Sequence, residues 1–250
     1  MALGWGSQLH HVYMTLNKIY IVGGASSGLG YECAINLAKK NKVIGLYNSN
    51  QKKNIKNLKF FKMNLEKKNE IFSFFRKNKG ELNKYKKIVF INFATYKKDS
   101  LIINLNEKDI NKSFNINLFS NFLFTSNLIK EYKNKFLDII FISSTLGLKG
   151  DVGTLLYSSS KKGLESLMKS IIIEYSNFNI KCNILVLGFF ESPLWKKLSD
   201  QKRTKIKKLI PNGKLGKTSH LNKTLSFIEQ NNYLNGSSIY LDGGFGKIKI

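Results

Sequence analysis

The sequence has few acidic residues and almost no arginine. Its 250 residues include 16 aspartates and glutamates against 41 lysines and arginines, giving a formal net charge of +25. Only Arg76 and Arg203 are arginines, and the lysines are scattered along every expected helix. A nucleic-acid groove would concentrate charge on one face and use arginine for bidentate contacts. We therefore interpret the excess as biased composition and predict no nucleic-acid partner; weak binding of an acidic partner or polyanion is the alternative.

Proline and long apolar runs are also scarce. The chain has two prolines and no linker, repeat or low-complexity break, which predicts a single domain over residues 15–250. Residues 1–14 are set apart as a leader of uncertain origin, because Met14 could be the original start; the segment lacks the charged start and apolar centre of a signal peptide. Since no window holds about 18 uninterrupted apolar residues, we predict no membrane partner.

Cysteine and histidine are too few for a disulfide scaffold or a metal site. Cys33 and Cys182 are the only cysteines, and both lie in apolar contexts typical of reduced core residues. We therefore predict a cytoplasmic protein. His220 is alone, and neither carboxylates nor cysteines cluster at ligand spacing, so no metal is expected.

Short apolar runs alternate with longer segments of helical period. The runs predict seven strands, nearly continuous in apolar residues as buried parallel strands are. They are Lys18–Gly23, Val43–Tyr47, Leu58–Met63, Ile88–Asn92, Asp138–Ser143, Ile180–Val186 and Ser238–Leu241. Strand–helix alternation over the whole length predicts an α/β fold with a doubly wound, parallel, seven-stranded sheet and helices on both faces.

Apolar stripes between the strands predict the helices. We expect each stripe to face the core. The four stripes are Leu29, Cys33 and Leu37; Ile71, Phe74 and Phe75; Ile110, Phe114, Leu118 and Phe122; and Leu164, Leu167, Met168 and Ile171. Only about ten residues separate the second and third strands, so the helix there is expected to be short or absent.

The first strand runs into the glycine-rich stretch "GGASSGLG" (23–30), which opens a helix. At such a corner, backbone N–H groups and the helix dipole favour a negatively charged ligand. Glycine lets a pyrophosphate approach closely and permits positive φ. Because ligands bind at the carboxyl ends of parallel strands, the stretch predicts a dinucleotide site.

Three residues further along suggest acid–base chemistry. Tyr157 and Lys161 are four apart, so both project from one face of a helix. A nearby ammonium group stabilises phenolate, so we expect Lys161 to lower the pKa of Tyr157. Ser144 directly follows the stretch "DIIFIS" (138–143) at the end of a strand, where its hydroxyl can hydrogen-bond a substrate carbonyl or alcohol. The pair alone is a weak signal, and its weight comes from the motifs around it.

Together and in order, these motifs resemble the classical short-chain dehydrogenase/reductase family, with a layout similar to 3-oxoacyl-carrier-protein reductases. The resemblance spans about residues 18–244. The glycine motif is "GGASSGLG", the N-N-A-G motif is "NFAT" (92–95), the helical asparagine is Asn117 and the catalytic serine is Ser144. Tyr157 and Lys161 supply Y-x-x-x-K, and "LGFFES" (187–192) stands for the P-G motif.

The resemblance implies a Rossmann-type fold and a carbonyl–alcohol oxidoreductase. Tyr157 would be the general acid and base, Lys161 would bind the nicotinamide ribose, Ser144 would polarise the carbonyl, and Asn117 would hold a water in a proton relay. Homotetramers or homodimers formed through the helices carrying Asn117 and Tyr157 are also implied. The implied cofactor contacts are Gly24, Ser26, Ser27, Gly28, Leu29, Gly30, Tyr47, Asn48, Ser49, Asn64, Leu65, Asn92, Phe93, Ala94, Tyr157, Lys161, Gly188, Phe190 and Ser192.

The chain departs from the family pattern at several positions outside the catalytic four. The usual threonine of the glycine motif is Gly23, and N-N-A-G has Phe93 and Thr95. The aspartate expected near the adenine is Asn64, and the proline before Gly188 is Leu187. These changes bear on cofactor affinity and turn geometry.

The end of the second strand indicates which cofactor is used. A carboxylate there would bond the ribose 2′-hydroxyl of NAD, whereas basic or small polar groups accept a 2′-phosphate. The chain has "YNSN" (47–50) followed by Lys52 and Lys53. This favours NADP(H) over NAD(H).

The substrate is expected to be a small carbonyl or alcohol compound, free or bound to a carrier protein. The segment after Gly188 matches the lid of 3-oxoacyl-carrier-protein reductases, and its apolar residues either line a pocket or pack the lid onto the body. They are Phe189, Phe190, Leu194 and Trp195. Ile173 replaces the arginine usual in those reductases, which keeps a sugar or polyol dehydrogenase open. A catalytically idle dinucleotide-binding subunit is the other alternative.

Overall fold

A computed structural model of the chain describes residues 16–192, 195 and 198–247. The predicted leader, residues 1–14, lies outside the described residues, and so does Leu194. Within this described part, no helix is long and apolar enough to cross a membrane.

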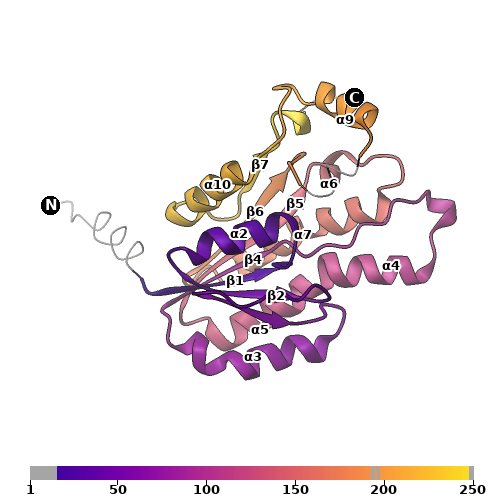
Figure 1. The fold of residues 1–250 in the computed structure, drawn as a ribbon. Coiled ribbons are helices and arrows are strands. Elements are labelled where there is room, and N and C mark those ends of the chain that lie inside the picture. Colours follow the sequence, from indigo (N-terminus) through magenta and orange to yellow (C-terminus); the bar gives the residue numbers. More distant parts are fainter. Residues whose placement is uncertain (1–15, 193–194, 196–197, 248–250) are drawn as a thin grey trace.

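Seven strands form one parallel sheet in the order β3-β2-β1-β4-β5-β6-β7 (Figure 1). This confirms the predicted doubly wound sheet, whose strand order reverses between β1 and β4. The strands are β1 (Lys18–Gly23), β2 (Lys42–Tyr47), β3 (Leu58–Lys62), β4 (Lys87–Asn92), β5 (Phe136–Ser144), β6 (Ile180–Leu187) and β7 (Ser238–Leu241).

Helices cover both faces of the sheet (Figure 1). The α2–α10 face carries α2 (Gly28–Ala38) and α10 (Thr218–Gln230), and the opposite face carries α3 (Lys68–Asn83), α5 (Ser120–Tyr132) and α7 (Leu155–Glu174). The shorter elements are η1 (Ile102–Asn104), α4 (Glu107–Phe114), η2 (Asn115–Phe119), α6 (Leu146–Lys149), α9 (Asp200–Leu209) and η3 (Phe245–Lys247). No helix forms between β2 and β3, as the short connection predicted.

Side chains alternate between two cores along each strand. In β1, Ile19 and Ile21 pack against α3, α5 and α7, whereas Tyr20 and Val22 pack against α2 and α10. This period of two on a sheet covered on both faces explains why the strands read as continuous apolar runs. Cys33 and Cys182 are buried within these cores and are not bonded to each other.

Three of the four predicted stripes face the core, and one does not. Ile110 is 38% exposed and Phe122 is 43% exposed, so their expected burial is wrong. An α-helix turns about 100° per residue, so fourth-residue spacing drifts about 40° at each step. The π-helical segment η2, Asn115–Phe119, interrupts the same helix and changes its register again. Leu118 still packs against the core, while the two ends of the stripe turn outward.

Candidate functional site

The glycine turn connects β1 to α2 at the carboxyl edge of the sheet. Gly24 and Gly28 both have positive φ, +69° and +54°. A Cβ on Gly30 would lie 2.4 Å from the carbonyl oxygen of Gly24, so the turn itself requires glycine there. A Cβ on Gly28 would meet no heavy atom within 4 Å. The turn is therefore tight on its inner side and open in front of the helix.

The amino end of α2 fits an anionic group. Its N-cap Ser27 is extended and makes no side-chain capping bond, and the residues of its first turn, Gly28 to Tyr31, include no acid. The first N–H groups of a helix lack intrahelical partners and carry the positive end of its dipole. This arrangement suits the pyrophosphate of a dinucleotide in the space that Gly28 leaves open.

The end of β2 presents polar side chains beside this turn. Tyr47 is buried against Phe60, with ring centroids 6.5 Å apart, while Asn48 and Ser49 are exposed. The ammonium group of Lys52 lies 5.1 Å from the ring centroid of Tyr31 in the first turn of α2. A positive charge is thus held where the second strand and the glycine turn meet.

Asn64 is already used in a local turn after β3. Its side-chain oxygen accepts a hydrogen bond from the backbone N–H of Glu66 at 3.0 Å, and its own N–H donates to the Glu70 carboxylate at 2.7 Å. Leu65 packs partly buried against the core. A contact of Asn64 with an adenine would fall to its carboxamide N–H groups or to the second lone pair of its side-chain oxygen.

Asn92 ends β4 directly beside the glycine turn. Its side chain accepts from the N–H of Ala94 at 3.0 Å and donates to Asn121 at 2.9 Å. A Cβ on Gly23 would lie 2.1 Å from the Asn92 Oδ1, so any side chain at this position would require Asn92 to shift. The Phe93 N–H donates to the carbonyl of Gly23 at 2.9 Å, so the two turns hold each other.

Asn117 is fully buried in η2, and its side chain has five hydrogen-bonding contacts. Its Oδ1 accepts from the backbone N–H of Tyr96 at 2.7 Å and from the hydroxyl of Thr95 at 3.1 Å. Its Nδ2, which has two N–H groups, lies within hydrogen-bonding distance of three acceptors: the Tyr96 carbonyl at 2.9 Å and the hydroxyls of Ser160 at 3.0 Å and Ser113 at 3.3 Å. Asn117 therefore joins the loop after β4 to α7, which carries Tyr157.

Ser144, Tyr157 and Lys161 lie together at the carboxyl end of β5. The hydroxyl of Ser144 lies near enough to that of Tyr157 to lower the pKa of Tyr157. The ammonium group of Lys161 lies 5.8 Å from the Tyr157 ring centroid and donates to the carbonyl of Ile142 at 2.9 Å. Burial lowers the pKa of Lys161 to about 8. Lys161 can therefore exchange its proton near neutral pH.

The pKa of Tyr157 corrects the expectation from the sequence. Burial raises it above its ordinary value, the hydrogen bond from Ser144 lowers it in part, and the charge of Asp99 raises it further. The expected lowering by Lys161 is absent here, because the ammonium group is directed at a strand carbonyl. The phenol is therefore held protonated, ready to act as a proton donor.

The loop after β6 closes the same edge of the sheet. A Cβ on Gly188 would lie 2.6 Å from the Cα of Asp242, so glycine lets two backbone segments approach closely. Phe190 is buried and pairs with Gly216 through an isolated parallel bridge. The hydroxyl of Ser192 accepts from the N–H of Trp195 at 3.2 Å. Phe190 is thus packed into the protein beneath the loop, which fits the packing alternative for this residue.

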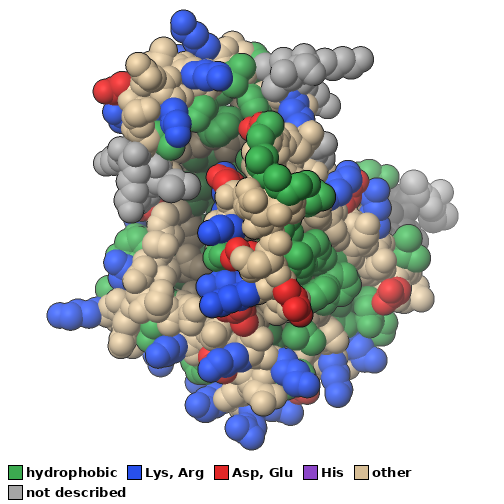
Figure 2. All heavy atoms as spheres, turned by 90° about the vertical axis from the view of Figure 1, so that its right-hand side faces the viewer, with side chains coloured by type: hydrophobic (Ala, Val, Ile, Leu, Met, Phe, Trp, Pro, Cys, Tyr) green, Lys and Arg blue, Asp and Glu red, His purple; other side chains and the backbone are tan. Residues whose placement is uncertain are grey.

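The structure gathers the predicted residues at one edge of the sheet. Strand register places Gly23 beside Asn92 and Ser144 beside Leu187, one residue before Gly188. Sequence reasoning missed Ser113 and Ser160, the buried partners of Asn117, because nothing distinguishes them locally from the other serines of their helices. Figure 2 views this edge and shows Lys and Arg side chains spread over the face, with acidic groups fewer.

Comparison with known proteins identifies the family. The sequence model of the short chain dehydrogenase family matches residues 18–203. The chain belongs to this family. It is therefore an oxidoreductase that interconverts a carbonyl and a hydroxyl group by hydride transfer with a nicotinamide dinucleotide. The resemblance seen in the motifs is confirmed.

Curated relatives are similar along nearly their whole length. The 3-oxoacyl-acyl-carrier-protein reductase FabG of Buchnera aphidicola subsp. Schizaphis graminum is 31% identical over 237 residues, covering 91% of this chain and 96% of the relative. The enzyme of the same name from Rickettsia felis is 30% identical over 232 residues, with the same coverage.

Solved structures confirm the fold. A putative gluconate dehydrogenase from Agrobacterium tumefaciens superposes with a TM-score of 0.82 at 20% identity, covering 93% of this chain and 97% of that one. A short chain dehydrogenase from Bacillus anthracis gives a TM-score of 0.81 at 19% identity, with coverage of 92% and 96%.

Proposed function

We propose that this short chain dehydrogenase reduces 3-oxoacyl thioesters with NADPH, using Tyr157 as the proton donor. The observation that carries the proposal is that Ser144, Tyr157 and buried Lys161 lie together at the carboxyl end of β5, with the Lys161 ammonium group 5.8 Å from the Tyr157 ring centroid. Two hydroxyl donors so arranged suit the oxygen of a carbonyl that is gaining negative charge. The relatives that are 3-oxoacyl-acyl-carrier-protein reductases support the substrate class.

In this mechanism the protein binds and orients the carbonyl and supplies the proton. The nicotinamide supplies the hydride. Ser144 donates a hydrogen bond to the carbonyl oxygen, and the Tyr157 hydroxyl transfers its proton to that oxygen as the negative charge develops. Lys161, with a pKa of about 8, could return a proton to the phenolate once its ammonium group turns away from the carbonyl of Ile142. The Asn117 side chain, held by Thr95, Tyr96, Ser113 and Ser160, keeps the loop after β4 in place against α7.

The preference for NADP(H) is proposed from the charge beside the glycine turn. Tyr47, Asn48 and Ser49 include no carboxylate, and Lys52 lies against Tyr31 on the first turn of α2. A 2′-phosphate there would gain one charge-assisted contact, which the 2′-hydroxyl of NADH would not. The preference is tested by titrating nicotinamide fluorescence with each cofactor.

Replacing Lys52 with alanine should weaken NADPH binding about fivefold to tenfold and leave NADH binding unchanged, as expected for one exposed charged contact. Lys56→Ala, an exposed lysine of the same segment, is the matched control. Equal losses for both cofactors would contradict a role for Lys52 in recognising the 2′-phosphate.

We propose that the thioester substrate is bound to a carrier protein, because helix α9 in the lid segment is strongly basic. Helix α9 carries exposed Lys202, Lys205, Lys207 and Lys208, with Asp200 as its only acidic residue. An acidic carrier protein would be attracted to this surface in a salt-dependent way. Acetoacetyl thioesters, free and carrier-bound, should be compared with gluconate and polyols. Turnover of the sugar acids alone would favour the alternative dehydrogenase.

The activity is tested with Tyr157→Phe, which removes the proton donor and little else. Turnover of an acetoacetyl thioester should fall about 10²–10⁴-fold, the usual contribution of a positioned general acid. NADPH binding should persist, which separates lost chemistry from lost folding. If the wild-type protein binds the cofactor but turns over neither thioesters nor polyols, the idle-subunit alternative gains support.

We also propose that copies of the chain associate through the helices that carry Asn117 and Tyr157. Phe119 is 50% exposed, Phe122 43% and Ile173 74%, and such side chains are usually covered in an assembly. Light scattering that gives a monomer mass at micromolar concentration would contradict this.

A further inference from the structure

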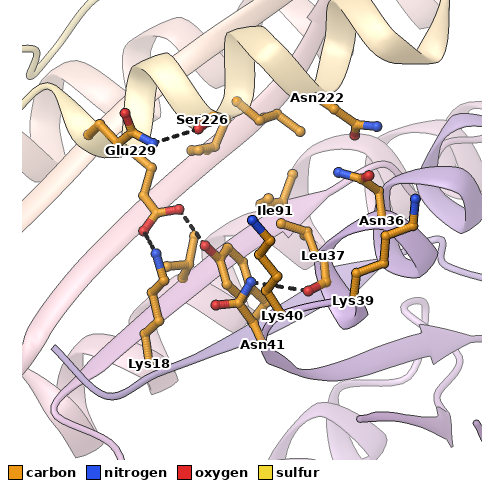
Figure 3. Close-up of a pocket in the computed structure, with 15 residues that line it drawn as sticks. Lys18, Asn36, Leu37, Lys39, Lys40, Asn41, Ile91, Asn222, Ser226 and Glu229 are labelled. Carbon is orange, nitrogen blue, oxygen red and sulfur yellow. Dashed lines mark hydrogen bonds and ion pairs between the residues drawn. The ribbon is translucent and has the colours of Figure 1, made fainter. Parts of the chain in front are cut away.

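A cavity lies away from the catalytic edge, between α2 and α10. Its volume is about 410 Å³. It reaches Lys18 at the amino end of β1, whereas the glycine turn follows the carboxyl end of the same strand (Figures 1 and 3). The cavity falls within the size range of small-molecule sites, roughly 300–1,000 Å³.

The inside of this α2–α10 cavity is apolar, and its mouth is positively charged. Val89, Ile91, Ile140 and Leu225 contribute the apolar surface, all of them from the core beneath α2 and α10. Three lysines, Lys18, Lys39 and Lys40, line it against a single carboxylate, Glu229. A ligand that matches this lining has an apolar body and a negative charge.

Glu229 does not offset that positive charge, because it is already paired. Its carboxylate lies 2.5 Å from the ammonium group of Lys18 and 3.5 Å from that of Lys87, and it accepts a hydrogen bond from the Tyr20 hydroxyl. Lys39 and Lys40 are exposed, and no carboxylate in the described part of the chain pairs with either. Their charges are available to a bound anion.

Asn222 indicates that the ligand also carries a hydrogen-bond donor. Its side-chain oxygen is buried and has no partner among the described residues, although the cavity adjoins it. Asn222 on α10 and Asn36 on α2 point toward one another across the space in Figure 3. A buried acceptor is normally hydrogen-bonded, so a donor is expected here.

We propose that the α2–α10 cavity binds a small organic anion that carries a hydroxyl or amino group. Its carboxylate or phosphate lies against Lys39 and Lys40, its apolar body rests on Ile91 and Leu225, and its donor reaches the oxygen of Asn222. This site is separate from the proposed dinucleotide and substrate site, so both can be filled at once.

The experiment titrates the NADPH-saturated protein with 3-hydroxybenzoate by isothermal calorimetry. Two probes isolate the groups of the ligand: benzoate lacks the donor, and 3-hydroxybenzyl alcohol lacks the charge. We expect saturable binding of one 3-hydroxybenzoate per chain and weaker binding of both other probes. No saturable binding at about 10 mM, the weak limit for a specific small ligand, would overturn the proposal.

Variants locate the binding. Lys39→Gln with Lys40→Gln should weaken 3-hydroxybenzoate about tenfold or more, the loss expected for charge-assisted contacts. Lys68→Gln with Lys77→Gln removes the same charge from α3, across the sheet, and should change nothing. Asn222→Leu should reduce 3-hydroxybenzoate to the affinity of benzoate. Binding unaffected by the Lys39 and Lys40 changes, or abolished by NADPH, would place the anion elsewhere and overturn the proposal.

Discussion

Two lysines of the described chain are almost fully buried, and they lie at opposite ends of the sheet. Lys87, 2% exposed, begins β4 and lies 2.8 Å from Asp138 and 3.5 Å from Glu229. Lys161, 4% exposed, lies at the carboxyl edge and donates to the carbonyl of Ile142. A buried charge is costly unless it is paired. At the amino edge, two carboxylates pair with Lys87 and offset the cost of burying it. At the catalytic edge, no carboxylate among the described residues pairs with Lys161.

This difference separates a structural use of buried charge from a functional one. The paired lysine joins β4 and β5 to α10 through Asp138 and Glu229, and neither partner faces the predicted catalytic residues. Burial lowers the pKa of the less fully paired Lys161 to about 8, close to the working range of a proton-transfer group. We expect the two lysines to respond to the same substitution in opposite ways.

Lys161→Met should produce the largest effect, a loss of turnover of about 10³-fold, because proton return and cofactor contact are both removed. The same variant should be more stable than the wild type at pH 7, since it no longer buries a poorly paired charge. Acetoacetyl thioester reduction and urea unfolding measure the two effects. Lys162→Met, an exposed neighbour, should leave both nearly unchanged. A Lys161→Met protein that is less stable than the wild type would contradict the inference that Lys161 is a poorly paired buried charge.

Lys87→Met should destabilise the fold by about 3 kcal/mol or more, because it leaves buried Asp138 and Glu229 without their shared partner. Turnover per folded molecule should be retained, since the change lies at the amino edge. Urea unfolding of this variant is best compared with Lys86→Met, the exposed lysine beside it, for which a change within about 0.5 kcal/mol is expected. Equal stability of Lys87→Met and Lys86→Met would contradict a structural role for Lys87.

The pH dependence of stability tests whether the pKa of Lys161 is lowered in the fold. Lys161 keeps its proton up to about pH 8 in the fold, whereas an ordinary lysine keeps it up to 10.5. Between these values the unfolded chain holds more protons, so this group makes stability rise with pH. The advantage of Lys161→Met over the wild type should be about 2–3 kcal/mol at pH 7 and should shrink toward pH 10. An advantage that grows with pH would contradict the lowered pKa.

Local pattern predicted the sheet but not its ionic links. All seven strands were located to within two residues, because each is a short apolar run bounded by polar residues. Lys87, in contrast, stands in "KYKKIVF" like any exposed lysine before a strand, and its partners come from β5 and α10. Such a contact depends on tertiary packing and leaves no periodic trace in the sequence.

In the candidate site too, local pattern predicted which residues lie together but not how their side chains interact. Spacing and order predicted Ser144, Tyr157 and Lys161, which lie together. The pKa of Tyr157 was predicted in the wrong direction, because helix spacing gives the proximity of Lys161 and says nothing of the carbonyl at which its ammonium group is directed. The outward turn of Ile110 and Phe122 was also missed, since fourth-residue spacing over three steps does not stay on one face of a helix.

The π-helical segment that holds Asn117 constrains how this chain can change length. Each residue added to or removed from a helix rotates the remainder of that helix by about 100°. Losing one residue from Asn115–Phe119 would restore ordinary helical winding and swing Asn117 away from Tyr96 and Ser160. A single-residue deletion within Asn115–Phe119 should therefore disturb the site even where the residue removed is exposed, as Phe119 is.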